Sequence, residues 1–61
     1  MGEYVIVDYA GGILGVSSCE ASLWDRVHRL YSKDVIKECE ITVISRREYN
    51  RRFGDVQQEK M

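Results

Sequence analysis

The stretch that decides the fold is Tyr4-Val5-Ile6-Val7, a run of residues with a strong preference for β-strands. Successive side chains of a strand point to opposite faces of its sheet. Val5 and Val7 therefore share one face, while Tyr4 and Ile6 share the other. Both faces of this strand are apolar, which is typical of a strand in the middle of a sheet whose two faces are both covered.

Glycines after this stretch predict a β-hairpin. Residues 3–9 form the first expected strand, residues 10–12 form a turn that contains two glycines, and residues 13–17 form the second strand. Glycine adopts a positive φ without steric cost, as tight hairpin turns require. The chain is therefore expected to start with two antiparallel strands. Gly15 weakens the second strand and is typical either of a bulge or of a close approach of another backbone.

A helix is expected after the hairpin. Ser17 and Glu20 have the capping-box spacing that starts many helices. Apolar side chains then recur at intervals of three and four residues, which indicates a helix with one buried face. These side chains are Leu23, Val27, Leu30 and Tyr31, with Trp24 at the margin of the stripe. The pattern predicts a helix over residues 18–32.

The rest of the chain is expected to form a strand and a short helix. Residues 36–44 alternate between apolar and polar side chains, which predicts a half-buried third strand. A second capping-box pattern, from Ser45 to Glu48, predicts a short helix that ends near Phe53. The polar residues 55–61 are expected to fray.

These elements predict an α+β fold, with a single ββαβ domain and a short terminal helix over residues 1–54. The three-stranded antiparallel sheet is expected in the order 2-1-3, with the long helix packed on one face. That face is expected to carry Val5, Val7, Leu14, Val16, Ile41 and Val43. The second face would carry Tyr4, Ile6, Ile13 and Ile44.

The apolar side chains of the second face need to be buried, and the sequence leaves two ways to bury them. The terminal helix can fold back over this face with Tyr49 and Phe53, or another molecule can lie on it. A chain of 61 residues buries only about 60% of its unfolded surface and is marginally stable alone. Small domains of this kind often gain stability by association. We therefore expect a protein partner, with a homodimer as one form of it.

The composition limits the range of functions. The chain has two cysteines, no proline and a net charge of −1. Cys19, His28 and Cys39 lack the spacing of a metal site, and two cysteines are no disulfide framework. No signal peptide or membrane-spanning run is recognisable, which predicts a cytoplasmic protein without membrane contact. No catalytic motif is present and so small a sheet offers little room for a pocket, so we expect neither an enzyme nor a cofactor.

Two sets of residues are candidates for binding. Interface hot spots are enriched in Trp, Tyr and Arg. The partner-binding candidates are Tyr4, Ile6, Trp24, Tyr31, Arg47 and Arg51. The alternative is nucleic acid, with arginines on phosphates and an aromatic ring stacked on a base. The candidates for that role are Arg46, Arg47, Tyr49, Arg51 and Arg52. The slightly negative net charge makes nucleic acid the less favoured partner.

The layout over about residues 3–46 resembles two groups of small phage-encoded inhibitors of bacterial host enzymes. One group is the dimeric ββαβ inhibitors of uracil-DNA glycosylase, to which the stretches 12–31 and 34–37 are similar. The other is the short inhibitor of host RNA polymerase, to which the helix from Glu20 and the segment 41–46 are similar. The resemblance implies a non-enzymatic protein-binding module, a phage or mobile-element inhibitor that masks the surface of a host protein.

Overall fold

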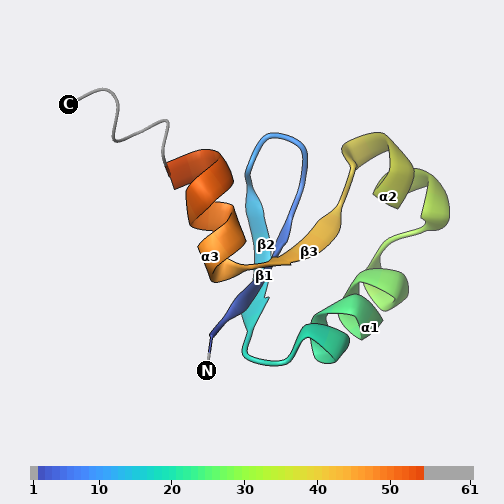
Figure 1. The fold of residues 1–61 in the computed structure, drawn as a ribbon. Helices are drawn as coiled ribbons and strands as arrows, with labels where there is room; N and C mark the ends of the chain where they lie inside the picture. The colour runs from blue at the N-terminus through green and yellow to red at the C-terminus, as the bar shows by residue number, and fades with distance from the viewer. Residues whose placement is uncertain (1, 55–61) are drawn as a thin grey trace.

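The computed structural model describes residues 2–54; residue 1 and residues 55–61, where fraying is predicted, lie outside the described part. The strands are β1 (Tyr4–Val7), β2 (Ile13–Ser17) and β3 (Thr42–Ser45). The helices are α1 (Glu20–Leu30), α2 (Lys33–Cys39) and α3 (Arg46–Tyr49), and α3 continues into a π-helical turn, η1 (Asn50–Gly54). Figure 1 shows their course along the chain.

The strands form one antiparallel sheet in the order β2-β1-β3, so the predicted α+β class and strand order are confirmed. Tyr4 lies opposite Ser17 on one side and opposite Ser45 on the other. The central place of β1 agrees with its apolar side chains on both faces. Val5 is 0% exposed and Val7 is 2% exposed, although they point away from Ile6, which is 1% exposed.

Helix α1 covers the face of β1 opposite to the predicted one. A single buried cluster joins Ile6, Leu23, Val27, Ile41 and Val43. Tyr4 packs against the same cluster, so Tyr4 and Ile6 face α1 while Val5 and Val7 face away from it. The predicted assignment is therefore wrong for these residues of β1, whereas Ile41 and Val43 do lie on the face covered by α1, as predicted. A period of two sorts the side chains into two sets without saying which set meets the helix.

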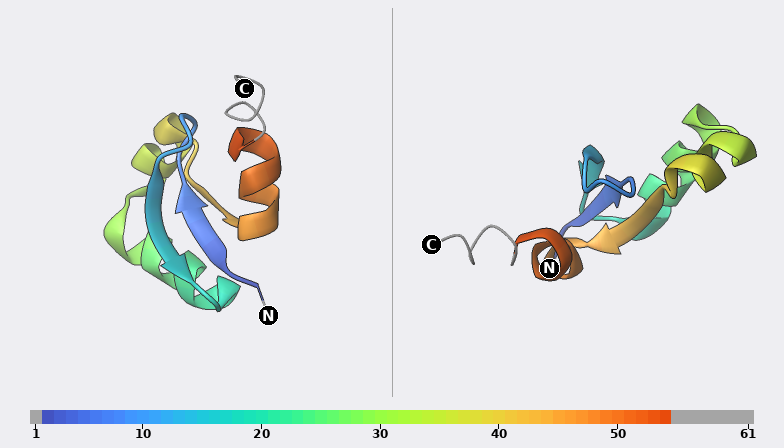
Figure 2. Two further views of the ribbon diagram at one scale, coloured as in Figure 1. Left: turned by 90° about the vertical axis from the view of Figure 1, so that its left-hand side faces the viewer. Right: turned by 90° about the horizontal axis from the view of Figure 1, so that it is seen from above.

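The chain's own C-terminal helix covers the other face of β1. Helix α3 packs beside β1 and β3. Figure 2 shows α1 and α3 on opposite sides of the sheet. The expectation that another molecule shields the second face of β1 is therefore wrong. The alternative, in which the terminal helix folds back with Tyr49 and Phe53, is the arrangement in the structure.

Two aromatic side chains fasten this terminal helix to the hairpin turn. The hydroxyl of Tyr49 donates a hydrogen bond to the carbonyl oxygen of Gly11 over 2.9 Å. The Phe53 ring lies so close to Gly11 that a Cβ there would be 2.8 Å from its Cδ1 atom. Gly11 has a φ of +87°, which only glycine adopts readily. We refer to Gly11, Tyr49 and Phe53 as the turn latch.

Tyr49→Phe tests the polar half of the turn latch. The variant keeps the ring but removes the donor to the Gly11 carbonyl. We expect the free energy of unfolding to fall by about 1 kcal/mol, the usual net value of one hydrogen bond. Urea denaturation followed by circular dichroism measures it. Tyr9→Phe is the matched control, because Tyr9 is 68% exposed. An equal loss in both variants would show that the hydroxyl at position 49 has no special role.

Helix α2 replaces the first half of the strand predicted over residues 36–44. The Oγ atom of Ser32 accepts the backbone N–H three residues later over 3.3 Å, which starts α2. Glu40 ends it in the left-handed conformation with a φ of 53°. Ile36 and Cys39 are one helical turn apart, and both pack against the core. The apolar residues here follow the helical period, and only β3 is extended.

The two predicted capping boxes have different outcomes. The N-cap of α1 is Cys19, whose side chain makes no capping hydrogen bond, so the first prediction is wrong. Ser17 instead accepts the N–H of Cys19 on its Oγ over 3.1 Å. Ser45 does cap α3, since its Oγ accepts the N–H of Glu48 over 3.0 Å. This cap turns the chain from β3 directly into α3 and sets α3 over the sheet.

Candidate partner-binding surface

Exposed apolar side chains gather on the edge strand β2. Ile13, Leu14 and Val16 are 41%, 41% and 44% exposed. Val7 lies opposite Ile13 while Ile6 lies opposite Gly15, so Leu14 is the extra residue of a bulge. Helix α3 packs beside β1 and β3 and α1 also contacts β2, yet these three side chains of β2 remain exposed. We refer to Ile13, Leu14 and Val16 as the β2 row.

The open edge of β2 also presents backbone groups. Along β1, the N–H of Tyr9 bonds on the β3 side and the N–H of Asp8 bonds on the β2 side. The same alternation makes Ile6 and Gly15 a hydrogen-bonded pair of β1 and β2. In a strand, the backbone N–H and C=O groups of consecutive residues point to opposite sides, so those of the residue after Gly15 point away from β1. The N–H and C=O of Val16 therefore point away from β1, toward the open edge.

No residue of β2 itself is charged. From Tyr9 to Cys19 the sequence contains no Asp, Glu, Lys or Arg, although these residues make up 31% of the chain. Edge strands commonly carry charges or proline, which oppose pairing with another strand. Strand β2 has neither, and its bulge at Leu14 lies near the turn. The segment from Gly15 to Ser17 is thus open to pairing.

The sequence-based candidates do not include the β2 row. The sequence predicts Leu14 and Val16 beneath the long helix and Ile13 on the second face. In the structure all three lie at the margin of the sheet instead. The signal that marks them is the charge-free run, which is unusual in so charged a chain.

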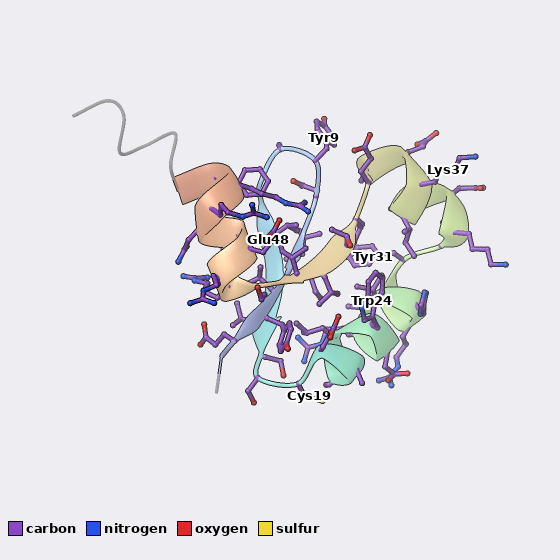
Figure 3. All side chains as sticks on the ribbon, in the orientation of Figure 1. Tyr9, Cys19, Trp24, Tyr31, Lys37 and Glu48 are labelled. Atoms are coloured by element: carbon purple, nitrogen blue, oxygen red, sulfur yellow. The ribbon has the colours of Figure 1, made fainter. Side chains whose placement is uncertain are left out.

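Tyr9 extends this surface at the hairpin loop. It is 68% exposed, and Figure 3 shows it projecting from the loop. Asp8 holds the loop in shape, because its Oδ1 atom accepts the N–H groups of Ala10 and Gly12 over 3.0 Å and 2.9 Å. A tyrosine on a braced turn offers a large amphipathic contact at a low entropic cost.

The predicted partner anchors lie elsewhere and are partly or wholly covered. Tyr4, Trp24 and Tyr31 are half-buried and pack against the core cluster. Trp24 also stacks on His28, with the ring centroids 5.9 Å apart. Ile6 is 1% exposed beneath α1, so it is a core residue and its prediction as a contact residue is wrong.

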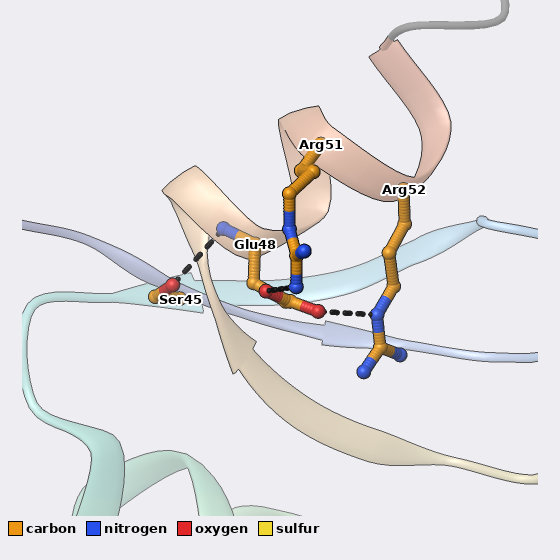
Figure 4. A network of polar contacts seen from close by, with 4 residues as sticks. All are labelled: Ser45, Glu48, Arg51 and Arg52. Atoms are coloured by element: carbon orange, nitrogen blue, oxygen red, sulfur yellow. Dashed lines mark hydrogen bonds and ion pairs between the residues drawn. The ribbon is translucent and has the colours of Figure 1, made fainter.

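The arginines of α3 and η1 are all exposed. They are Arg46, Arg47, Arg51 and Arg52. Glu48 binds two of them, with its Oε1 2.6 Å from Arg51 Nη2 and its Oε2 2.7 Å from Arg52 Nε (Figure 4). The guanidinium carbon of Arg46 lies 5.7 Å from the centre of the Tyr49 ring. Glu48 thus offsets part of the positive charge, and Tyr49 is engaged in the turn latch.

Hydrogen bonds from Arg51 and Arg52 lower the pKa of Glu48 from its ordinary value of 4.5. A carboxyl group with a lower pKa in the folded chain stabilises the fold where it is ionised in both states. That contribution is complete at neutral pH. It is lost as the pH falls through 4.5 and then through the lower folded pKa.

Glu48→Gln tests this linkage. We expect the variant to be less stable than wild type at neutral pH, because it loses the charge-assisted bonds to Arg51 and Arg52. The difference should vanish at acidic pH, where the wild-type carboxyl group is protonated too. Urea midpoints of both proteins across the acid range measure it. A difference that stays constant with pH would contradict the assigned cause.

Other kinds of site are not found among residues 2–54. That part of the chain contains no pocket, and no group of three or more His, Cys, Asp or Glu side chains there could hold a metal ion. Cys19 and Cys39 are both free. None of the helices described is long and apolar enough to cross a membrane. The described residues do offer an apolar strand edge and a group of arginines.

Comparison with known proteins identifies no relative. No protein-family model matches the chain, and neither the curated proteins nor the solved structures include a significant match. The candidate surface is accordingly defined by the geometry of this chain.

Proposed function

We propose that this chain is a small non-enzymatic protein-binding module that contacts its partner through the β2 row and Tyr9. The observation that supports it is the group of three neighbouring apolar side chains, each at least 41% exposed, on an uncharged strand edge. Full burial of such a side chain is favourable by about 1.5–3 kcal/mol. A partner that covers the row recovers much of that free energy, which the isolated chain forfeits.

In this proposal the module is a phage or mobile-element inhibitor that masks the surface of a host protein in the cytoplasm. The antiparallel sheet with β1 central supports the resemblance to such inhibitors, although two helices, α1 and α2, lie between β2 and β3. A standard interface covers about 800 Å² on each partner. Because the accessible surface here is 4665 Å², one such contact would occupy a substantial share of the chain.

Affinity capture with matched variants tests this function. Wild type, Val16→Lys and Leu30→Lys are immobilised and exposed to bacterial lysate, and a captured protein is then purified for titration. Leu30 is the control, since it is 62% exposed but lies on α1. We expect Val16→Lys to weaken binding at least about 10-fold, the equivalent of one lost apolar contact. Leu30→Lys should bind like wild type. Binding that is unaffected by Val16→Lys would contradict the proposed surface.

A nucleic-acid-binding function is the second candidate, supported by the four exposed arginines of α3 and η1. Phosphate contacts make affinity fall steeply with salt, whereas an apolar interface does not. Titration of labelled single-stranded DNA at about 50 and 200 mM salt separates the two. Salt-dependent binding that is lost in Arg47→Glu would favour this candidate. Absence of DNA binding at the lower salt would remove it.

A further inference from the structure

We infer that the partner on the β2 edge is a second copy of this chain, paired antiparallel with β2 so that the two sheets become one. The inference rests on the proposed function that the β2 row is a protein-binding surface, and it names a second copy, in place of a host protein, as the occupant of that row. Its support comes from three features of the edge: the direction of its backbone groups, its lack of charge and the position of its apolar row.

The backbone of β2 suits a two-fold contact. In a two-fold interface each chain presents the same patch, so a strand meets its own copy in the antiparallel direction. The N–H and C=O of Val16 point out of the sheet, as derived from the register of β1 and β2. The same groups of the copy point back at them. Antiparallel pairing joins such outward groups into hydrogen bonds.

The absence of charge favours a copy in particular. Self-pairing brings identical segments together, so any charged side chain on the edge meets a like charge, which is destabilising. The run from Tyr9 to Cys19 contains no charged residue, so the side chains of β2 itself bring no like charges together, and the charge near this edge comes from Arg26 of α1 beside Gly15. A partner of opposite charge would gain nothing from such an edge.

The β2 row would also be covered by its copy. Val16 lies opposite Val5, so it belongs to the face of the sheet that α3 covers over β1 and β3. Side chains on one face of neighbouring strands contact each other. In the paired sheet, Leu14 and Val16 of each chain lie beside the row of the other. The apolar face then continues across both chains rather than ending in solvent.

The face of β2 toward α1 predicts how the dimer responds to salt. Gly15 has no side chain there, and a Cβ at that position would lie 3.0 Å from Ile6 Cδ1 and 3.4 Å from Arg26 Nη1. Two copies therefore bring two Arg26 guanidinium groups to one side of the shared sheet. Salt screens their repulsion. The dimer is expected to persist or tighten as salt increases, unlike a contact held by ion pairs.

Sedimentation equilibrium over about 1 μM to 1 mM chain tests the inference. Besides wild type, three synthetic proteins are compared: Val16→Lys, Leu30→Lys and a chain with a methyl group on the backbone nitrogen of Val16. That methyl group removes the outward N–H but leaves the pairing of β2 with β1 intact. We expect a dimer for wild type and Leu30→Lys. Both changes at Val16 should raise the dissociation constant at least about 10-fold. Circular dichroism checks that each protein is folded. If Val16→Lys does not fold, the dissociation constant of the methylated chain alone tests whether β2 forms the dimer interface.

The outcomes separate the inference from the proposed function. A wild-type monomer at the highest concentration overturns the inference, while capture of a different protein in a Val16-dependent manner leaves the proposed function in place. A monomer without any such capture overturns both. A dimer that is insensitive to both changes at Val16 has its interface elsewhere, and this too overturns the inference.

Discussion

Gly11→Ala is expected to lower the free energy of unfolding by about 3 kcal/mol. Two independent costs contribute. The φ of +87° lies in the left-handed region, where a Cβ costs about 1–2 kcal/mol. The new methyl group would also lie 2.8 Å from Cδ1 and 3.1 Å from Cε1 of Phe53. Overpacking of this kind costs about 1–3 kcal/mol, because the ring and the helix that carries it have to move.

Urea denaturation of Gly11→Ala measures this loss, and Gly2→Ala is the matched control. A Cβ at Gly2 meets nothing within 4 Å, so its stability should stay within about 0.5 kcal/mol of wild type. Repeating Gly11→Ala in a Phe53→Ala background removes the steric cost and leaves the cost of the positive φ. An equal loss in both backgrounds would contradict the contact between Gly11 and the Phe53 ring.

Ile6→Ala is expected to lower the free energy of unfolding by about 2–5 kcal/mol. Ile6 is 1% exposed and belongs to the cluster that joins β1, α1 and β3. Truncating it loses the burial of the side chain and leaves a cavity beneath α1. Domains this small have stabilities of about 5 kcal/mol, so the variant should be close to unfolded at room temperature.

Ile13→Ala is the matched control for Ile6→Ala. It makes the same chemical change on the neighbouring strand, at a side chain that is 41% exposed. We expect a loss below about 1 kcal/mol at low protein concentration, where the chain is monomeric. Thermal and urea unfolding of both variants, under identical conditions, give the comparison. Similar losses at the two positions would mean that Ile6 is not part of the core.

The turn latch fixes the position of the C-terminal helix on the sheet. Tyr49 and Phe53 reach Gly11, which is 38 residues from Tyr49 along the chain. This attachment holds α3 and η1 against the hairpin turn while α3 packs over β1 and β3. The β2 row remains exposed. The same contacts that complete the core on one side thereby define the candidate binding edge.

Local patterns in the sequence were sufficient to predict much of the fold. The alternation of Tyr4-Val5-Ile6-Val7 and the glycines after it predicted the hairpin and the central place of β1. The helical stripe predicted α1, and Ser45 predicted the start of α3. These features depend on backbone conformation and on the spacing of apolar residues over a few positions. The sequence carries such short-range information directly.

Only the tertiary structure decided which face of β1 meets α1, where the second cover comes from and which apolar residues stay exposed. Tyr4 and Ile6 contact α1, although either set of alternating residues could have done so. From the sequence alone, Tyr49 and Phe53 fit an exposed binding surface as well as a packing contact, and only their contact with Gly11 distinguishes the two. The reason is that burial depends on contacts between residues far apart in sequence, and a local period is the same whichever element lies on top of it.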